Sequence, residues 1–181
     1  MADRCLSGEQ AAARELFRRE HRRVHATLYR VIGHNRDMDD LLQETCLQGF
    51  QSLRRYRAEA KLSTWIDRIA VRVAYRYIRL RKPTVSLEMI PDPMAPVESP
   101  QRRAVAREGV RRFYAAVDGL PPAARVAFTL HELDGRSVLE AAKLMGASPT
   151  ATKVRVWRAR RALNKQAAAD PILAQFMREE K

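Results

Sequence analysis

The stretch ASPTATKVRVWRARRAL, residues 147–163, decides the fold of this chain. One set of its side chains is small or apolar and recurs at intervals of four, three and four residues: Thr152, Val156, Ala159 and Leu163. This spacing predicts a helix that turns the set inward. Five Arg or Lys residues precede Leu163, and Trp157 lies among them, outside the inward stripe. We therefore predict an outward face that is cationic and carries an indole.

The residues before this helix predict a helix-turn-helix unit. Ser137 and Glu140 have the spacing of a capping box that opens a short helix. Gly146 can supply the left-handed residue that ends it, and Ser148, followed by proline, caps the longer basic helix. Such a second helix offers cations to DNA phosphates and guanine edges, and a flat apolar group to a thymine methyl or a sugar. The alternative is a solvated amphipathic helix whose Trp157 docks on a neighbouring helix.

The rest of the sequence predicts helices on both sides of a proline-rich linker. The 181 residues include only seven Gly, and Ala, Leu, Arg and Glu are abundant. Residues 82–101 hold five of the nine prolines, which excludes a continuous helix there. Helices are predicted to begin near these residues: Ser7, Asp37 and Ser63 in the first lobe, and Ser99, Pro121, Ser137 and Ser148 in the second. We predict an all-α fold with two small helical domains, 7–81 and 102–169, joined by the linker 82–101. The tail, residues 170–181, is expected to add a further turn after Pro171.

The distribution of charge indicates a nucleic-acid partner. The net charge of +13 and the pI near 10.6 predict a polyanion as partner. The net charge is +7 in residues 1–81, −2 in residues 82–101 and +8 in residues 102–181. Two basic lobes around a slightly acidic spacer favour nucleic acid over an anionic membrane surface. Because no apolar run is long enough to cross a bilayer, we expect a cytoplasmic protein without stable membrane insertion.

Two segments of the chain together resemble one family. LHELDGRSVLEAAKLMGASPTATKVRVWRARRAL, residues 130–163, resembles region 4 of the extracytoplasmic-function (ECF) sigma factors of bacterial RNA polymerase. DMDDLLQETCLQGFQSLRRYR, residues 37–57, followed by STWIDRIAVRVAYRYIRLR, residues 63–81, resembles region 2 of the same family. The resemblance implies a transcription initiation factor that binds core polymerase, recognises the −35 and −10 promoter elements and assists promoter opening. ECF sigma factors are often held inactive by an anti-sigma factor, so the resemblance also suggests an anti-sigma factor as a third partner.

The resemblance implies roles for two sets of residues in the first lobe. The helix that docks on core polymerase would present this set: Asp40, Leu41, Leu42, Gln43 and Glu44. The −10 element would be contacted by a loop and the helix that follows it: Ala60, Lys61, Leu62, Ser63, Arg72 and Arg76. Relatives often carry Asn at one or both of the last two positions, and Arg favours phosphate or guanine contacts over adenine readout. Leu41 and Leu42 could equally be core residues, and Trp65 reads as a buried anchor.

The resemblance also implies the residues that meet the −35 element. They belong to the helix-turn-helix unit and to the helix before it: His131, Ser148, Thr150, Lys153, Val154, Trp157 and Arg158. His131 stands where relatives often place Arg, and a neutral histidine would weaken a phosphate contact, since its ordinary pKa is about 6.5. His131 could equally be a plain helix-surface residue.

Two other classes of protein compete with this interpretation. A free-standing helix-turn-helix regulator would use only the C-terminal unit, and its first lobe would be a sensor domain. An enzyme is not expected, because the sequence shows no nucleophile elbow, no Gly-rich phosphate loop and no plausible triad. His21 and His25 have a helical i, i+4 spacing, but their cationic surroundings would repel a metal ion. We therefore expect no catalytic residues, no metal and no cofactor.

Overall fold

The computed structural model describes residues 10–33, 36–53, 55–80 and 100–179, and every regular element in these ranges is a helix. The all-α prediction is therefore confirmed for the described part of the chain. Most of the predicted linker 82–101 lies outside the described residues, as do the predicted caps at Ser7 and Ser99. Among the described helices, none carries an apolar stretch long enough to cross a membrane.

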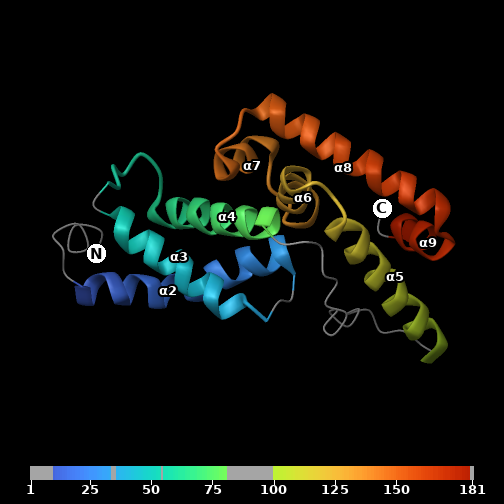
Figure 1. Ribbon diagram of the computed structural model, residues 1–181, viewed down its shortest axis with the longest axis horizontal. Helices are drawn as coiled ribbons and strands as arrows, with labels where there is room; N and C mark the ends of the chain where they lie inside the picture. The colour runs from blue at the N-terminus through green and yellow to red at the C-terminus, as the bar shows by residue number, and fades with distance from the viewer. Residues whose placement is uncertain (1–9, 34–35, 54, 81–99, 180–181) are drawn as a thin grey trace.

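The described part of the N-terminal lobe consists of three helices, α2 (Gln10–Ile32), α3 (Met38–Leu53) and α4 (Leu62–Leu80), each packed against the other two (Figure 1). The buried face of α4 includes a carboxylate, Asp67, whose side chain is 1% exposed. Arg23 of α2 binds it through two nitrogens, with Nη2 2.6 Å from Oδ2 and Nε 3.0 Å from Oδ1. The pair satisfies a charge that would otherwise be buried alone, and the hydrogen bond to Asp67 raises the pKa of Arg23.

Residues 100–179, the described part of the C-terminal lobe, form six helical elements. They are α5 (Pro100–Asp118), α6 (Pro122–Phe128), a π-helical turn η1 (Thr129–Leu133), α7 (Val138–Met145), α8 (Pro149–Ala169) and α9 (Pro171–Glu179). The tail is longer than the predicted turn, because α9 spans nine residues and packs against α5 and α8. Asp170 fixes this corner: its Oδ1 accepts hydrogen bonds from the amides of Ile172 and Leu173, and the carboxylate pairs with Arg112 at 2.8 Å.

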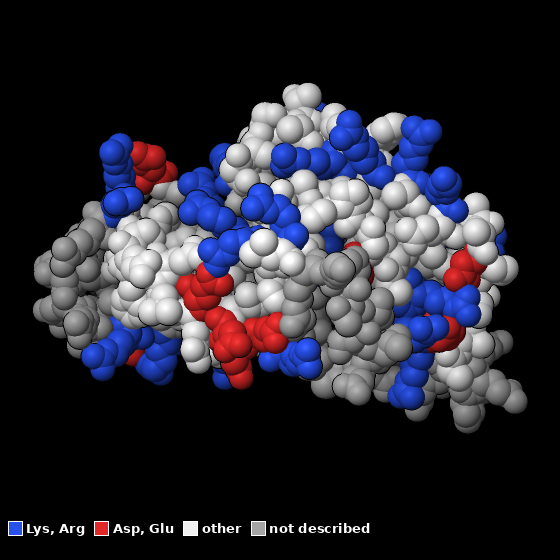
Figure 2. All heavy atoms as spheres, viewed as in Figure 1, with Lys and Arg blue, Asp and Glu red and all other residues white. Residues whose placement is uncertain are grey.

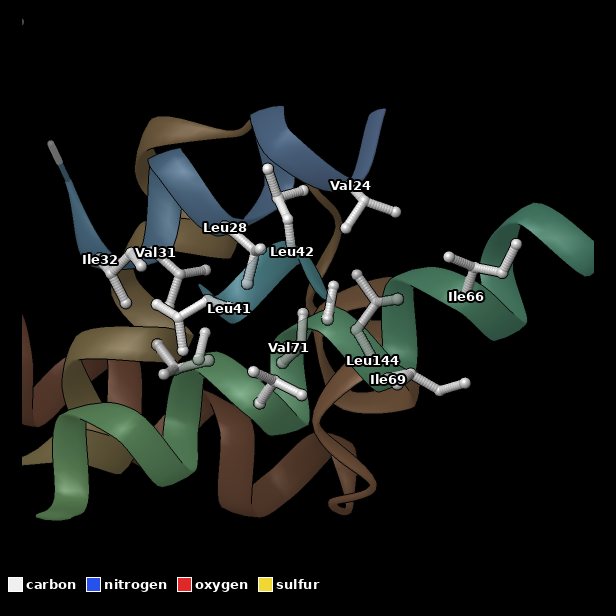
Figure 3. Close-up of a cluster of buried hydrophobic side chains, with 14 of the residues drawn as sticks. Val24, Leu28, Val31, Ile32, Leu41, Leu42, Ile66, Ile69, Val71 and Leu144 are labelled. Atoms are coloured by element: carbon white, nitrogen blue, oxygen red, sulfur yellow. The ribbon is translucent and has the colours of Figure 1, made fainter. Parts of the chain in front are cut away.

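The two lobes pack on one another through a shared hydrophobic core. Four side chains of the C-terminal lobe belong to the same buried cluster as the apolar faces of α2, α3 and α4: Val126, Leu130, Ala141 and Leu144. Figure 3 shows Leu144 of α7 among the side chains of the N-terminal lobe. Helix α4 consequently lies between α3 on one side and α6 and α7 on the other. The predicted domain bounds remain a prediction, since residues 81–99 are not described.

Polar contacts across the lobes add to this packing. The Arg125 side chain of α6 is only 11% exposed, and it donates Nε to the Val31 carbonyl at 3.1 Å and Nη2 to the Ile32 carbonyl at 3.0 Å. These carbonyls belong to the last turn of α2, where carbonyl groups lack helical partners and attract cations. Arg30 of α2 also pairs with Asp134, with Nη1 2.9 Å from Oδ1.

Candidate nucleic-acid interface

The predicted helix-turn-helix unit is formed by α7, the turn at Gly146 and α8. Ser137 and Glu140 make the expected capping box, with each side chain bonded to the other residue's backbone amide. Gly146 ends α7 in the left-handed conformation at φ 62°. Ser148 caps α8 by accepting the Ala151 amide at 3.1 Å. The local signals read from the sequence are therefore confirmed.

The inward stripe of α8 is also confirmed, because Thr152, Val156, Ala159 and Leu163 are its buried residues. Thr152 is an unusual member, since it brings a hydroxyl into the core. Its Oγ1 donates to the Ser148 carbonyl at 3.0 Å, so the hydroxyl is satisfied within the helix. The helix therefore keeps its predicted rotation.

The outward face of α8 is open to solvent. Lys153, Val154, Trp157 and Arg158 are all exposed, and Trp157 keeps 57% of its surface. The alternative in which the indole docks on a neighbouring helix is therefore wrong. Instead the Arg161 guanidinium lies 5.4 Å from the centre of the indole ring, an attractive cation–π arrangement. A flat apolar group framed by cations is suited to a DNA groove edge.

Two residues near this face, Arg160 and His131, make polar contacts within the protein. Arg160 pairs with Glu132, with Nη2 2.7 Å from Oε1, so its charge is partly neutralised. His131 donates from Nδ1 to the Arg136 carbonyl at 2.7 Å, and its Nε2 lies 3.5 Å from Glu132. Only Nε2 of His131 could therefore face a ligand. Thr150 is exposed in the first turn of α8, beside the Ser148 cap.

The predicted −10 residues lie in a loop and on α4. Lys61 is exposed, while Ala60, Leu62 and Ser63 are half-buried. The Ala60 carbonyl accepts a hydrogen bond from the Tyr56 hydroxyl at 2.6 Å, which fixes one side of the loop. Ala58 has φ 55°, a left-handed conformation that is unusual for a residue other than Gly. Trp65 is partly buried against the N-terminal core, as expected of an anchor.

The structure joins one predicted −10 residue to one predicted docking residue. Arg76 is exposed on α4, yet its guanidinium forms an ion pair with Glu44 of α3. Gln48 also donates to Glu44, at 2.9 Å. Arg72, one turn before Arg76, is exposed and forms no ion pair among the described residues. Of the two arginines, Arg72 is the more available for a phosphate.

The predicted docking residues divide between the core and the surface of α3. Leu41 and Leu42 are each 5% exposed and belong to the buried cluster. Asp40 and Gln43 are exposed, and Glu44 is half-buried. Among the predicted docking residues, a partner could therefore reach Asp40, Gln43 and Glu44 but not the two leucines.

Sequence reasoning missed two apolar side chains that extend this face. Leu47 is 59% exposed and Phe50 is 36% exposed, one and two turns after Gln43. The centroid of the Phe50 ring lies 4.5 Å from the centroid of the Phe17 ring, and this contact stabilises the position of Phe50 at the surface. Their spacing from Asp40 and Gln43 was the available signal. We call Asp40, Gln43, Leu47 and Phe50 the α3 face.

On the face drawn in Figure 2, the charges over α8 and over α3 differ in sign. Figure 2 shows Lys and Arg gathered over α8 and over the seam that α4 forms with the helix-turn-helix unit, while Asp and Glu gather over α3. A basic surface attracts the DNA backbone, and a mixed acidic and apolar surface is suited to a protein partner. The molecule therefore offers two chemically different surfaces.

Comparison with known proteins identifies both lobes. Residues 16–84 match the family model of sigma-70 region 2, and residues 111–163 match the model of sigma-70 region 4. The "ECF RNA polymerase sigma-E factor" of Haemophilus influenzae is 27% identical over 170 residues, covering 88% of this chain and 89% of the relative. The protein of the same description from Escherichia coli K12 is 26% identical over 174 residues, covering 91% of each chain.

Solved structures agree with these matches. The structure of CnrH in complex with the cytosolic domain of CnrY superposes with a TM-score of 0.62 at 25% identity, covering 93% of this chain and 96% of CnrH. The sigma factor RpoE of Bartonella quintana, solved with the anti-sigma factor NepR, has a TM-score of 0.58 at 21% identity, covering 81% of this chain and 91% of RpoE. The fold and its two matched regions thus define a sigma factor of the sigma-70 class. Within that class, the chain belongs to the ECF sigma factors.

Proposed function

We propose that this ECF sigma factor binds core RNA polymerase through the α3 face, contacts the −10 element through residues 60–63, where the loop meets the start of α4, and through the rest of α4, and contacts the −35 element through α8. The observation that carries the proposal is the exposed face of α8, where Lys153 and Arg158 flank the indole of Trp157, which no described helix covers. The proposal keeps the site residues predicted from the sequence, except that the apolar contacts with the polymerase are assigned to different residues of α3. Leu41 and Leu42 support α3 from the core, while Leu47 and Phe50 take the apolar contacts with the polymerase.

The magnitudes of promoter opening support a need for the polymerase. Separating on the order of ten base-pair steps requires roughly 14 kcal/mol, at a mean of ~1.4 kcal/mol per step. Stacking an unpaired base on a protein surface returns about 1–3 kcal/mol. A single short loop cannot offset the difference, and phosphate contacts favour duplex and single strands alike. The free protein should therefore bind promoter DNA weakly and should not melt it.

Promoter binding also requires the lobes to separate. The −35 and −10 elements lie about two helical turns apart, roughly 70 Å at 34–36 Å per turn. In the packed arrangement, α4 lies directly against α6 and α7. The chain between the lobes could span at most roughly 70 Å when extended, at 3.3–3.6 Å per residue. Binding to the polymerase would draw the two lobes apart and present α4 and α8 to their separate elements.

Two further parts of the proposal concern location and regulation. The protein would act in the cytoplasm, where its polymerase and promoters are found, and without enzymatic activity. CnrH, which this chain resembles, was solved with the cytosolic domain of another protein, and we include an anti-sigma factor as a third partner. The match of residues 16–84 to region 2 speaks against a free-standing helix-turn-helix regulator, which would carry a sensor domain there.

The experiment is a binding titration of the full chain against purified core polymerase. The Gln43→Lys variant adds a cation to the α3 face, and it should weaken binding by roughly tenfold if that face meets a basic partner. The matched control is Gln166→Lys, the same change at an exposed position of α8, which should bind as the unchanged protein does. Absence of binding by the unchanged chain, or equal weakening by both variants, would refute the proposal.

A further inference from the structure

A cleft of about 520 Å³ lies between the two lobes. One wall is α4, with Arg68, Arg72 and Tyr75, and the other wall comes from the C-terminal lobe, with Lys143 of α7 and Arg155 of α8. Its volume falls in the range of roughly 300–1,000 Å³ that small-molecule sites occupy. The cleft is walled by α4, α6, α7 and α8, so it suits a small molecule rather than a duplex.

The charged residues that line this cleft are all cationic. Arg68, Arg72, Lys143 and Arg155 are its charged residues, and no carboxylate lines it. None of the four forms an ion pair with any described residue. Arg68 Nε is fully buried and has no hydrogen-bond partner among the described residues. Buried donors in folded proteins are normally satisfied, and four uncompensated cations repel one another. The lining is therefore complementary to an anion of high charge.

The remaining lining is apolar and includes one aromatic ring. Tyr75 lies on α4 beside Arg72, and aliphatic side chains complete the wall: Val71, Ala123, Val126, Leu144 and Met145. A ring of this kind can stack against a nucleobase, because every base presents a π-face. Guanidinium groups bind phosphate oxygens in a two-pronged geometry. A ligand with a flat apolar end and a polyanionic end matches both parts of the lining.

We propose that the cleft between α4 and the helix-turn-helix unit binds a nucleoside polyphosphate, with its phosphates on Arg68, Arg72, Lys143 and Arg155 and its base against Tyr75. Because the two lobes each supply part of the site, the ligand binds only while they are packed together. It therefore stabilises the packed arrangement by mass action. Arg72 is also one of the residues proposed to meet the −10 element, so the occupied cleft opposes promoter engagement. This last consequence rests on the proposed function.

The test is calorimetric titration of the full chain, without polymerase or DNA, using GTP, ATP and inorganic tripolyphosphate as probes. The double variant Lys143→Gln with Arg155→Gln removes the charges of the C-terminal wall and should weaken nucleotide binding by roughly tenfold or more. The control double variant, Lys165→Gln with Arg178→Gln, removes two exposed cations outside the cleft and should bind as the unchanged chain does. The Tyr75→Leu variant should weaken the nucleotides while leaving tripolyphosphate unaffected.

Several results would overturn the assignment. They are absence of saturable nucleotide binding, equal weakening by both double variants, and tripolyphosphate binding as tight as nucleotide binding. Ligand-free melting curves of each variant establish that it is folded before the titration is interpreted. Since no polymerase takes part, failure here leaves the sigma-factor proposal intact, and failure to bind polymerase leaves this site intact.

Discussion

The contact between Arg125 and the end of α2 allows a prediction about how tightly the lobes hold together. Replacing Arg125 with Met keeps an apolar stem and removes the guanidinium. The change eliminates the hydrogen bonds to the Val31 and Ile32 carbonyls and leaves Asp118 without its partner at 2.7 Å. Burial lowers the pKa of Arg125 and raises the pKa of Asp118, and the charge of each partner opposes the other's shift.

The size of the effect follows from the two hydrogen bonds that cross between the lobes. A hydrogen bond from a charged donor contributes about 1.5–3 kcal/mol. The ion pair with Asp118 lies within the C-terminal lobe, so its loss affects the packed and the separated lobes alike. We therefore expect the packed arrangement to lose about 3 kcal/mol, which shifts the ratio of packed to separated lobes by more than roughly a hundredfold.

Small-angle X-ray scattering of the full chain measures this shift directly. The Arg125→Met variant should show a larger radius of gyration than the unchanged chain, with helix content by circular dichroism preserved. The control is Asp118→Asn, which removes the ion pair inside the C-terminal lobe and retains both hydrogen bonds to α2. It should remain compact. A compact Arg125→Met variant of unchanged stability would refute the reasoning that this side chain holds the lobes together.

Three more predictions concern stability. Arg23→Leu should destabilise the N-terminal lobe by about 3–5 kcal/mol in urea unfolding, because Asp67 is then buried without a partner. Gly49→Ala should cost about 1–3 kcal/mol in the same assay, because a Cβ there would lie 2.2 Å from Phe17 Cζ. Hydrogen bonds from Arg111 and Arg112 lower the pKa of Glu108 from 4.5 to about 2. The contribution of ionised Glu108 to folding stability is therefore present above pH 4.5 and is lost as the pH falls toward 2. Melting temperatures measured over this pH range should detect the loss.

Each of these predictions has a matched control. Arg23→Leu combined with Asp67→Leu removes both charges and should recover most of the lost stability. In Gly119→Ala, the added Cβ lies 3.5 Å from its nearest atom, the Ala116 carbonyl oxygen, so the urea concentration at the midpoint of unfolding should barely change. In the Glu108→Gln variant, the melting temperature should fall less between pH 4.5 and pH 2 than it does in the unchanged chain. An equally steep fall would contradict the assignment to Glu108.

Local features of the fold could be predicted because they depend on neighbours in the sequence. The stripe from Thr152 to Leu163 follows from helical spacing alone, and the capping box at Ser137 follows from residues three apart. The left-handed end at Gly146 needs only the absence of a Cβ. The exposed face of α8 follows from the same spacing, because residues outside the inward stripe lie on the outward side of the helix.

Long-range contacts could not be predicted from these patterns. Arg125 meets Val31 at a separation of 94 residues, and neither position carries a local signal of the other. Arg160 is one of the five cations in the stretch 147–163, yet Glu132, 28 residues away in the sequence, pairs with it and partly neutralises its charge. The Arg76 ion pair with Glu44 and the core shared by the lobes are also contacts between residues far apart in the sequence. Periodicity shows which face of a helix is buried but not which element covers it.

The most direct test of the central claim is transcription by a reconstituted enzyme. Purified core polymerase is combined with sheared genomic DNA of the source bacterium, with and without the full chain, and transcript 5′ ends are sequenced. We predict a small set of start sites that appear only when the chain is added and that disappear when Lys153 and Arg158 are both replaced by Ala. Identical start sites with and without the chain would contradict its role as a sigma factor.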